Sequence, residues 1–139
     1  MNQSLQRFEK AHQQNFQIAL SEIKKGKKTS HWMWFIFPQI KGLGNSETSR
    51  YYAMENLDEA QAFLDHSVLG NNIISITSEL LNLQTNNATS VFGKPDDMKL
   101  HSSLTLFSLV PRTNPIFQKA LDKYFKGNKD LKTINLLAE

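Results

Sequence analysis

Residues 68–83, VLGNNIISITSELLNL, decide the fold class of this sequence. Apolar residues recur there at alternating intervals of four and three, at Leu69, Ile73, Ile76, Leu80 and Leu83. This spacing places them on one face of an α-helix, whereas a half-buried strand would need alternation of period two. The stretch therefore predicts a helix with one buried face.

Helical patterns also account for most of the remaining chain. Residues 4–25 carry an apolar stripe, with Ser4 as the expected N-cap and Gly26 as a left-handed C-cap. A loop is expected at residues 84–90, and further helices at residues 32–35, 47–54, 58–66, 96–111, 115–125 and 130–137, with a buried strand as the alternative for the apolar run from residue 32. Alternation of period two never persists. We therefore predict an all-α fold, a compact single-domain bundle of about six to eight helices over residues 1–139.

Composition narrows the possible chemistry. The chain has 139 residues, with 16 Lys plus Arg against 13 Asp plus Glu, four His and no Cys. Without Cys, disulfides, Cys-based zinc sites and thiol nucleophiles are excluded. The longest apolar run, residues 32–38, is far shorter than the ~20 residues that cross a bilayer, so we expect a cytoplasmic protein without a membrane partner. The net charge of +3 is weak evidence for nucleic-acid binding, and the one basic cluster, Lys24, Lys25, Lys27 and Lys28, is typical of a solvated helix end.

The segment SHWMWFIFPQ, residues 30–39, concentrates candidate ligand-binding residues. It holds both tryptophans, Trp32 and Trp34, together with Ser30, His31 and Gln39. Such rings either anchor a core or form a wall on which a base or nicotinamide ring stacks. Trp32 and Trp34 cannot share one helix face, so we expect one to pack inward and the other to line a groove. His31 is a candidate general acid or base, with a capping or structural histidine as the alternative.

A glycine-containing loop, residues 42–46, follows and leads into the helix expected near Glu47. Its two glycines permit left-handed backbone, and exposed amides before a helix suit an anion such as phosphate. A plain loop is the alternative, because the third glycine of the dinucleotide fingerprint is missing. Ser49 and Tyr52 share a helix face. The candidate ligand-binding residues here are Gly42, Gly44, Ser46, Ser49 and Tyr52.

Asp96, Lys99 and Ser103 share one face of the helix expected from residue 96. Asp96 and Lys99 are ordinarily a solvated ion pair, whereas beside a pocket they would contact ribose hydroxyls or phosphate. The remaining histidines lie on separate helices without metal-ligand spacing. We therefore predict no metal site and assign no cofactor.

Several segments resemble a bacterial family of unknown function whose members are sometimes labelled calpastatin. They are SHWMWFIFPQIKGLGNS, SRYYAM, LDHSVLG, VFGKPDDMKLHSSLTLF and FQKALDKYFKGNKDLKTINLL, and together they span nearly the whole chain. The resemblance implies a compact all-α domain. A calpastatin inhibits its protease through a long disordered chain, whereas this sequence is typical of a folded one, so we reject that label.

Other segments resemble the NADAR superfamily, which is associated with NAD and ADP-ribose metabolism and includes N-glycosidases. They are residues 51–54, 97–99, 124–125 and 131–137, in the same order as the superfamily's motifs. The superfamily has a Glu just before its Tyr pair, whereas this chain has Thr48-Ser49-Arg50 there, with Glu47 a turn earlier. Either Glu47 takes the role of that Glu, or this chain binds without cleaving.

Our leading hypothesis is that the chain binds a small nucleotide-like ligand, related to ADP-ribose or NAD. The ligand would lie between the aromatic segment (residues 30–39), the glycine loop (residues 42–46) and the helix at Asp96. If the chain is an enzyme, we expect a hydrolase of N-glycosidic bonds, with Glu47 or Asp96 as acid or base and His31 or Tyr52 orienting the substrate. The alternative is a non-enzymatic module that meets a protein or RNA through an exposed aromatic residue and the basic cluster.

Overall fold

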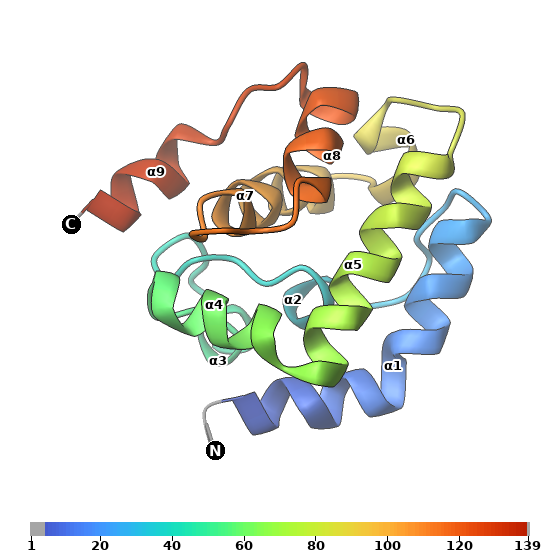
Figure 1. The fold of residues 1–139 in the computed structure, drawn as a ribbon. Helices are drawn as coiled ribbons and strands as arrows, with labels where there is room; N and C mark the ends of the chain where they lie inside the picture. The colour runs from blue at the N-terminus through green and yellow to red at the C-terminus, as the bar shows by residue number, and fades with distance from the viewer. Residues whose placement is uncertain (1–4, 139) are drawn as a thin grey trace.

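A computed structural model describes residues 5–138, and these residues form nine α-helices (Figure 1). In order they are α1 Gln6–Lys24, α2 Met33–Ile36, α3 Glu47–Tyr51, α4 Leu57–Asp65, α5 Ser67–Asn82, α6 Ala88–Phe92, α7 Asp96–Ser108, α8 Ile116–Phe125 and α9 Leu131–Ala138. Over residues 5–138 the only pairing of extended backbone is an isolated parallel bridge between Ile40 and Met54. The predicted all-α fold class is confirmed.

The helix at the centre of the packing is α5, whose apolar spacing predicted it. Leu69, Ile73, Ile76 and Leu80 are completely buried. Through this face α5 packs against α1, α4 and α8, and Figure 1 shows α5 running between them. His66 caps the helix, because its Nδ1 accepts hydrogen bonds from the backbone amides at positions 68 and 69. The predicted pattern thus corresponds to the main core helix.

Among the described residues, the structure has one helix more than the upper end of the predicted number. The additional helix is α6, which begins inside the loop expected at residues 84–90. The Asn87 side chain accepts a hydrogen bond from the Ser90 amide, and Ala88, Val91 and Phe92 are buried. A helix of five residues is too short for periodicity to reveal.

Helix boundaries differ in other places. The helix expected at residues 47–54 ends at Tyr51, and the one expected to reach Pro111 ends at Ser108. Ser4, the expected cap of α1, lies outside the described residues. The short helix expected at residues 32–35 is α2, so the alternative of a strand is wrong there.

A short backbone pairing joins two segments that are distant in sequence. The Met54 amide donates to the Gln39 carbonyl (2.9 Å), and the Lys41 amide donates to the Met54 carbonyl (2.9 Å). These bonds hold the end of the aromatic segment beside the chain that follows α3. The candidate site forms around this pairing.

The C-terminal helix α9 packs against α7 and lies at one end of the molecule in Figure 1. None of the described helices combines the length and the apolar character that a membrane span requires.

Candidate functional site

The aromatic segment is anchored by Glu22 on α1, a residue that sequence reasoning did not single out. Its carboxylate accepts hydrogen bonds from the Thr29 amide (2.7 Å), the Ser30 amide (3.0 Å), the Ser30 hydroxyl and the Trp32 indole N–H (2.8 Å). Burial of Glu22 alone would raise its pKa, but the hydrogen bonds from Ser30, Thr29 and Trp32 together outweigh burial and lower the pKa to about 2. Glu22 is therefore an ionised structural anchor.

Trp32 is the tryptophan that packs inward. It is 1% exposed and contacts the rings of Phe37 and Phe92 at centroid distances of 6.4 and 6.2 Å. Lys28 lies over the same indole, 5.0 Å from its centroid. Trp32 lines neither of the two cavities described below, so the structure places it in the core and not beside them. Ser30 lines neither cavity either, and its hydroxyl is bound to Glu22.

Trp34 is half-buried, and it lines two cavities. The Tyr52 cavity has a volume of about 200 Å³ and is lined by Tyr52, Arg50 and Glu55 among others. The Lys99 cavity has a volume of about 420 Å³ and lies between the glycine loop, α7 and the start of α9. Both cavities share the lining residues Trp34, Gln39, Gly44 and Ser49. The expectation that one tryptophan packs inward and the other borders a groove matches this placement.

Aromatic packing holds the Tyr52 side chain in the wall of the Tyr52 cavity. The Tyr52 ring lies 5.2 Å from Phe35 and 5.7 Å from Phe8, measured between ring centroids. Burial raises the pKa of the Tyr52 phenol, the neighbouring Tyr51 phenol adds to this, and Arg7 opposes it. Tyr52 therefore stays protonated and offers a hydroxyl that can donate or accept a hydrogen bond.

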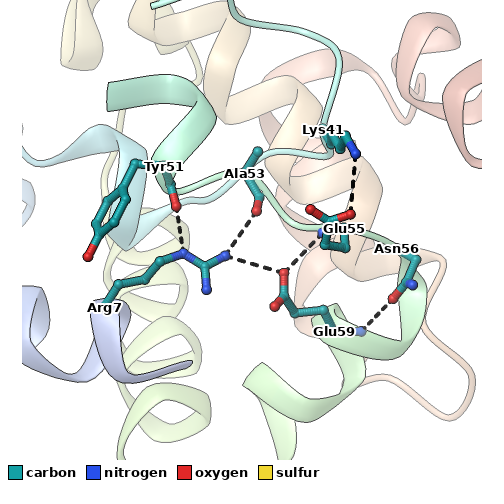
Figure 2. A network of polar contacts seen from close by, with 7 residues as sticks. All are labelled: Arg7, Lys41, Tyr51, Ala53, Glu55, Asn56 and Glu59. Atoms are coloured by element: carbon teal, nitrogen blue, oxygen red, sulfur yellow. Dashed lines mark hydrogen bonds and ion pairs between the residues drawn. The ribbon is translucent and has the colours of Figure 1, made fainter. Parts of the chain in front are cut away.

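Arg7 fixes the backbone on either side of Tyr52, as Figure 2 shows. Its guanidinium donates to the carbonyls of Tyr51 (2.6 Å) and Ala53 (3.0 Å) and pairs with Glu59 (3.3 Å). The Glu59 carboxylate also accepts a bond from the Glu55 amide (3.0 Å). This network, which joins α1 to α4 and was not expected from the sequence, determines where the wall of the Tyr52 cavity lies.

On the side of the Lys99 cavity, a row of ion pairs borders Trp34. Asp96 pairs with Lys28 (2.7 Å) and with Lys99 (3.5 Å). The Lys99 ammonium lies 4.8 Å from the centroid of the Trp34 indole. Asp96 lines neither cavity, although its partner Lys99 lines the Lys99 cavity. Lys28 is largely buried in this pair, which leaves three exposed lysines in the basic cluster.

The glycine loop has its shape for two different steric reasons. Gly42 has φ +107°, a left-handed conformation that a side chain opposes. A Cβ at Gly44 would lie 2.5 Å from the Ser49 hydroxyl and 2.6 Å from the Ser49 Cβ, so Gly44 is needed for close approach and not for left-handed backbone. The Ser46 hydroxyl caps α3 by accepting from the Ser49 amide (3.1 Å). These observations favour the plain loop over a phosphate cradle at the start of α3.

Two candidate catalytic residues lie away from both cavities. Glu47 and His31 are exposed, and neither lines the Tyr52 cavity or the Lys99 cavity. The structure thus brings eight candidate residues to the two cavities: Trp34, Gln39, Gly42, Gly44, Ser46, Ser49, Tyr52 and Lys99. It does not bring Ser30, His31, Trp32, Glu47 or Asp96 there.

Sequence reasoning missed His101 and Asp130, which both line the Lys99 cavity. The Nε2 atom of His101 lies 2.7 Å from the Asn128 carbonyl, and its ring stacks on Phe125 with 4.2 Å between centroids. The available signal was the position of His101 next to the face of α7 that carries Lys99. No local sequence pattern indicated that residues 128–130 pack against α7.

Each cavity is lined by more basic than acidic side chains. The Tyr52 cavity is lined by two basic residues, Lys41 and Arg50, and by one acidic residue, Glu55. The Lys99 cavity is lined by Lys99 and Lys132 and by one acidic residue, Asp130. The Lys41–Glu55 pair is loose, at 3.4 Å, and exposed. Across residues 5–138, no group of three or more His, Asp and Glu side chains is arranged to hold a metal ion. The local charge therefore suits an anionic ligand.

Comparisons with known proteins agree with the fold and name a family. The chain is similar to the crystal structure of the conserved hypothetical protein Rv1873 from Mycobacterium tuberculosis, with a TM-score of 0.94 and 40% sequence identity over 97% of this chain and 96% of that one. No curated protein matches the sequence. The family described as "Protein of unknown function (DUF1810)" matches residues 2–137, and the chain belongs to this family.

Proposed function

We propose that this protein binds a small nucleotide-like ligand, related to ADP-ribose or NAD, across the Tyr52 and Lys99 cavities. The observation that carries the proposal is the position of Trp34, a half-buried indole that borders both cavities and has the Lys99 ammonium over its ring. Any nucleobase can stack on an aromatic ring, because every base has a π-face. A phosphate group pairs with a nearby ammonium. A ligand that combines both features fits this arrangement.

The polar groups around Trp34 support the same class of ligand. Gln39 lines both cavities and presents an amide, which can donate to and accept from the edge of a base. Arg50 and Lys132 add positive charge on either side. The resemblance to NADAR proteins points to ADP-ribose and NAD as the first ligands to examine.

Hydrolysis of an N-glycosidic bond is the reaction that this resemblance suggests. Such a reaction needs a carboxylate that activates water or assists the leaving group. Glu55 and Asp130 line the cavities, whereas Glu47 does not and Asp96 is held between two lysines. The carboxylates beside a bound ligand would therefore be Glu55 and Asp130.

Titration calorimetry and thermal unfolding with ADP-ribose test the proposal. A ligand at 100 times its Kd stabilises a protein by about 2.7 kcal/mol, enough to raise Tm by several degrees. Trp34→Ala should weaken binding about tenfold or more, because stacking contributes roughly 1–3 kcal/mol per base. Lys119→Ala is the control for general effects of mutation, since Lys119 is exposed and lines neither cavity. Absence of any heat or stabilisation at millimolar ADP-ribose and NAD would contradict the proposal.

A further inference from the structure

His101 presents one ring nitrogen as a hydrogen-bond acceptor. Its Nε2 lies 2.7 Å from the Asn128 carbonyl, which can only accept, so Nε2 must carry the proton. In the neutral ring Nδ1 then holds a lone pair. No described residue bonds to Nδ1, and His101 lines the Lys99 cavity. The stack on Phe125 holds the ring in this orientation.

Asp130 presents a second acceptor in the same cavity. Its Oδ2 receives the hydroxyl of Ser102 (3.0 Å) and both the amide (3.2 Å) and the hydroxyl (2.6 Å) of Thr133. Its own amide donates to the Thr105 hydroxyl (2.9 Å). Within residues 5–138, no partner bonds to Oδ1. The carboxylate is thus held rigidly by one oxygen while the other remains available.

The two acceptors belong to one cavity because their anchors are adjacent in sequence. His101 binds the carbonyl of residue 128, and the next residue of α7, Ser102, binds the carboxylate of residue 130. Both contacts join α7 to residues 128–130, the short segment that precedes α9. Both side chains also line the Lys99 cavity.

We propose that His101 and Asp130 form a subsite that binds two adjacent hydroxyl groups, such as the 2′- and 3′-hydroxyls of a ribose. This inference rests on the proposed function and deepens it, because it specifies the sugar. Two neighbouring hydroxyls each donate one hydrogen bond, one to His101 Nδ1 and the other to Asp130 Oδ1. The Lys99 ammonium, in the same cavity, is left for a phosphate.

Other occupants fit this pair of acceptors less well. A phosphate would place oxygen lone pairs against the Asp130 carboxylate, which repels anions. A cationic amine could donate to both acceptors, but Lys99 and Lys132 line the same cavity and repel it. A neutral hydroxyl pair avoids both costs.

The experiment compares AMP with 2′,3′-dideoxy-AMP by titration calorimetry, because AMP contains a single ribose. For the wild-type protein we expect the dideoxy compound to bind about tenfold more weakly or worse, because it loses two hydrogen bonds, one of them to a charged carboxylate. His101→Phe keeps a ring that stacks on Phe125 and removes Nδ1. It should therefore reduce the ratio of the AMP affinity to the dideoxy-AMP affinity at least about threefold. His101→Asn places an amide near the position of Nδ1 and should restore part of the ratio. His31→Asn is the matched control at an exposed histidine that lines neither cavity.

The outcomes separate the two proposals. If wild-type protein binds AMP and dideoxy-AMP equally, or if His101→Phe keeps the wild-type ratio, the hydroxyl subsite is wrong while the proposed function stands. If wild-type protein binds neither AMP nor ADP-ribose, the proposed function fails and the subsite fails with it. Circular dichroism identifies a misfolded His101→Phe protein, in which case the ratio for His101→Asn decides: a ratio below that of the wild type supports the subsite, and an unchanged ratio overturns it.

Discussion

Replacing Glu22 with Gln would remove the charge that holds the aromatic segment against α1. The carboxylate of Glu22 accepts from two backbone amides, the Ser30 hydroxyl and the Trp32 indole. A Gln amide has one oxygen and one NH₂ group, so at least one of these donors would face another donor. We expect Glu22→Gln to fold and to lose stability.

The size of this loss follows from the pKa of Glu22. Burial raises that pKa and the four hydrogen bonds lower it, with a net value of about 2 against an ordinary value of 4.5. The difference of about 2.5 pH units corresponds to roughly 3 kcal/mol of stability at neutral pH. Because the folded-state pKa is the lower one, this stability is present above pH 4.5 and is lost as the pH falls toward 2. At pH 3 less than half of this stability should remain.

Urea unfolding of wild-type and Glu22→Gln protein at pH 7 and pH 3 measures both quantities. Glu47→Gln removes the same charge at an exposed position and is the control. We expect the wild type to exceed Glu22→Gln by about 3 kcal/mol at pH 7 and by less than half of that at pH 3. A difference below about 0.5 kcal/mol at pH 7, or one that does not narrow at pH 3, would refute the reasoning.

Two other variants test features of the core and of the glycine loop. Burial lowers the pKa of His12 to about 4, although its bond to the Phe35 carbonyl (2.8 Å) acts in the opposite direction. The neutral ring is therefore favoured in the fold, and the free energy of unfolding should fall by up to roughly 3 kcal/mol as the pH drops from 6.5 to 4. In His12→Gln this part of the pH dependence should vanish. If urea unfolding shows the same pH dependence of stability in His12→Gln as in the wild type, the explanation is contradicted. Gly44→Ala should cost about 1–3 kcal/mol, because the new Cβ collides with Ser49. Adding Ser49→Gly should recover most of that loss, and a double variant as unstable as Gly44→Ala would show that the collision is not the cause.

The long helices could be predicted because their burial is periodic. In α5 the residues that the spacing selects, such as Leu69 and Ile76, are completely buried. The short helix α6 could not be predicted in this way, because one turn provides no repeat. Its Asn87 cap is visible in the sequence only as one polar residue within a polar loop.

The candidate site was predictable in part, for a related reason. Trp34 and Lys99 were selected from separate local patterns, and the structure brings them within 4.8 Å of each other, measured from the ammonium to the ring centroid. His101 and Asp130 were missed because their arrangement depends on contacts between α7 and residues 128–130, which are 27 and 28 positions apart in the chain. Local spacing carries no information about such contacts.

The burial of Trp32 also explains the accessibility of Trp34. Glu22 binds the Trp32 indole N–H and thereby fixes that ring in the core. Residues two apart at a helix turn point to different sides, so a buried Trp32 directs Trp34 away from the same packing. The Gln39 carbonyl accepts in turn from the Met54 amide, and Trp34, Gln39 and Tyr52 line the same cavity. The buried anchor on α1 and the accessible indole are therefore two consequences of one local arrangement, and the aromatic segment serves as both core and cavity wall.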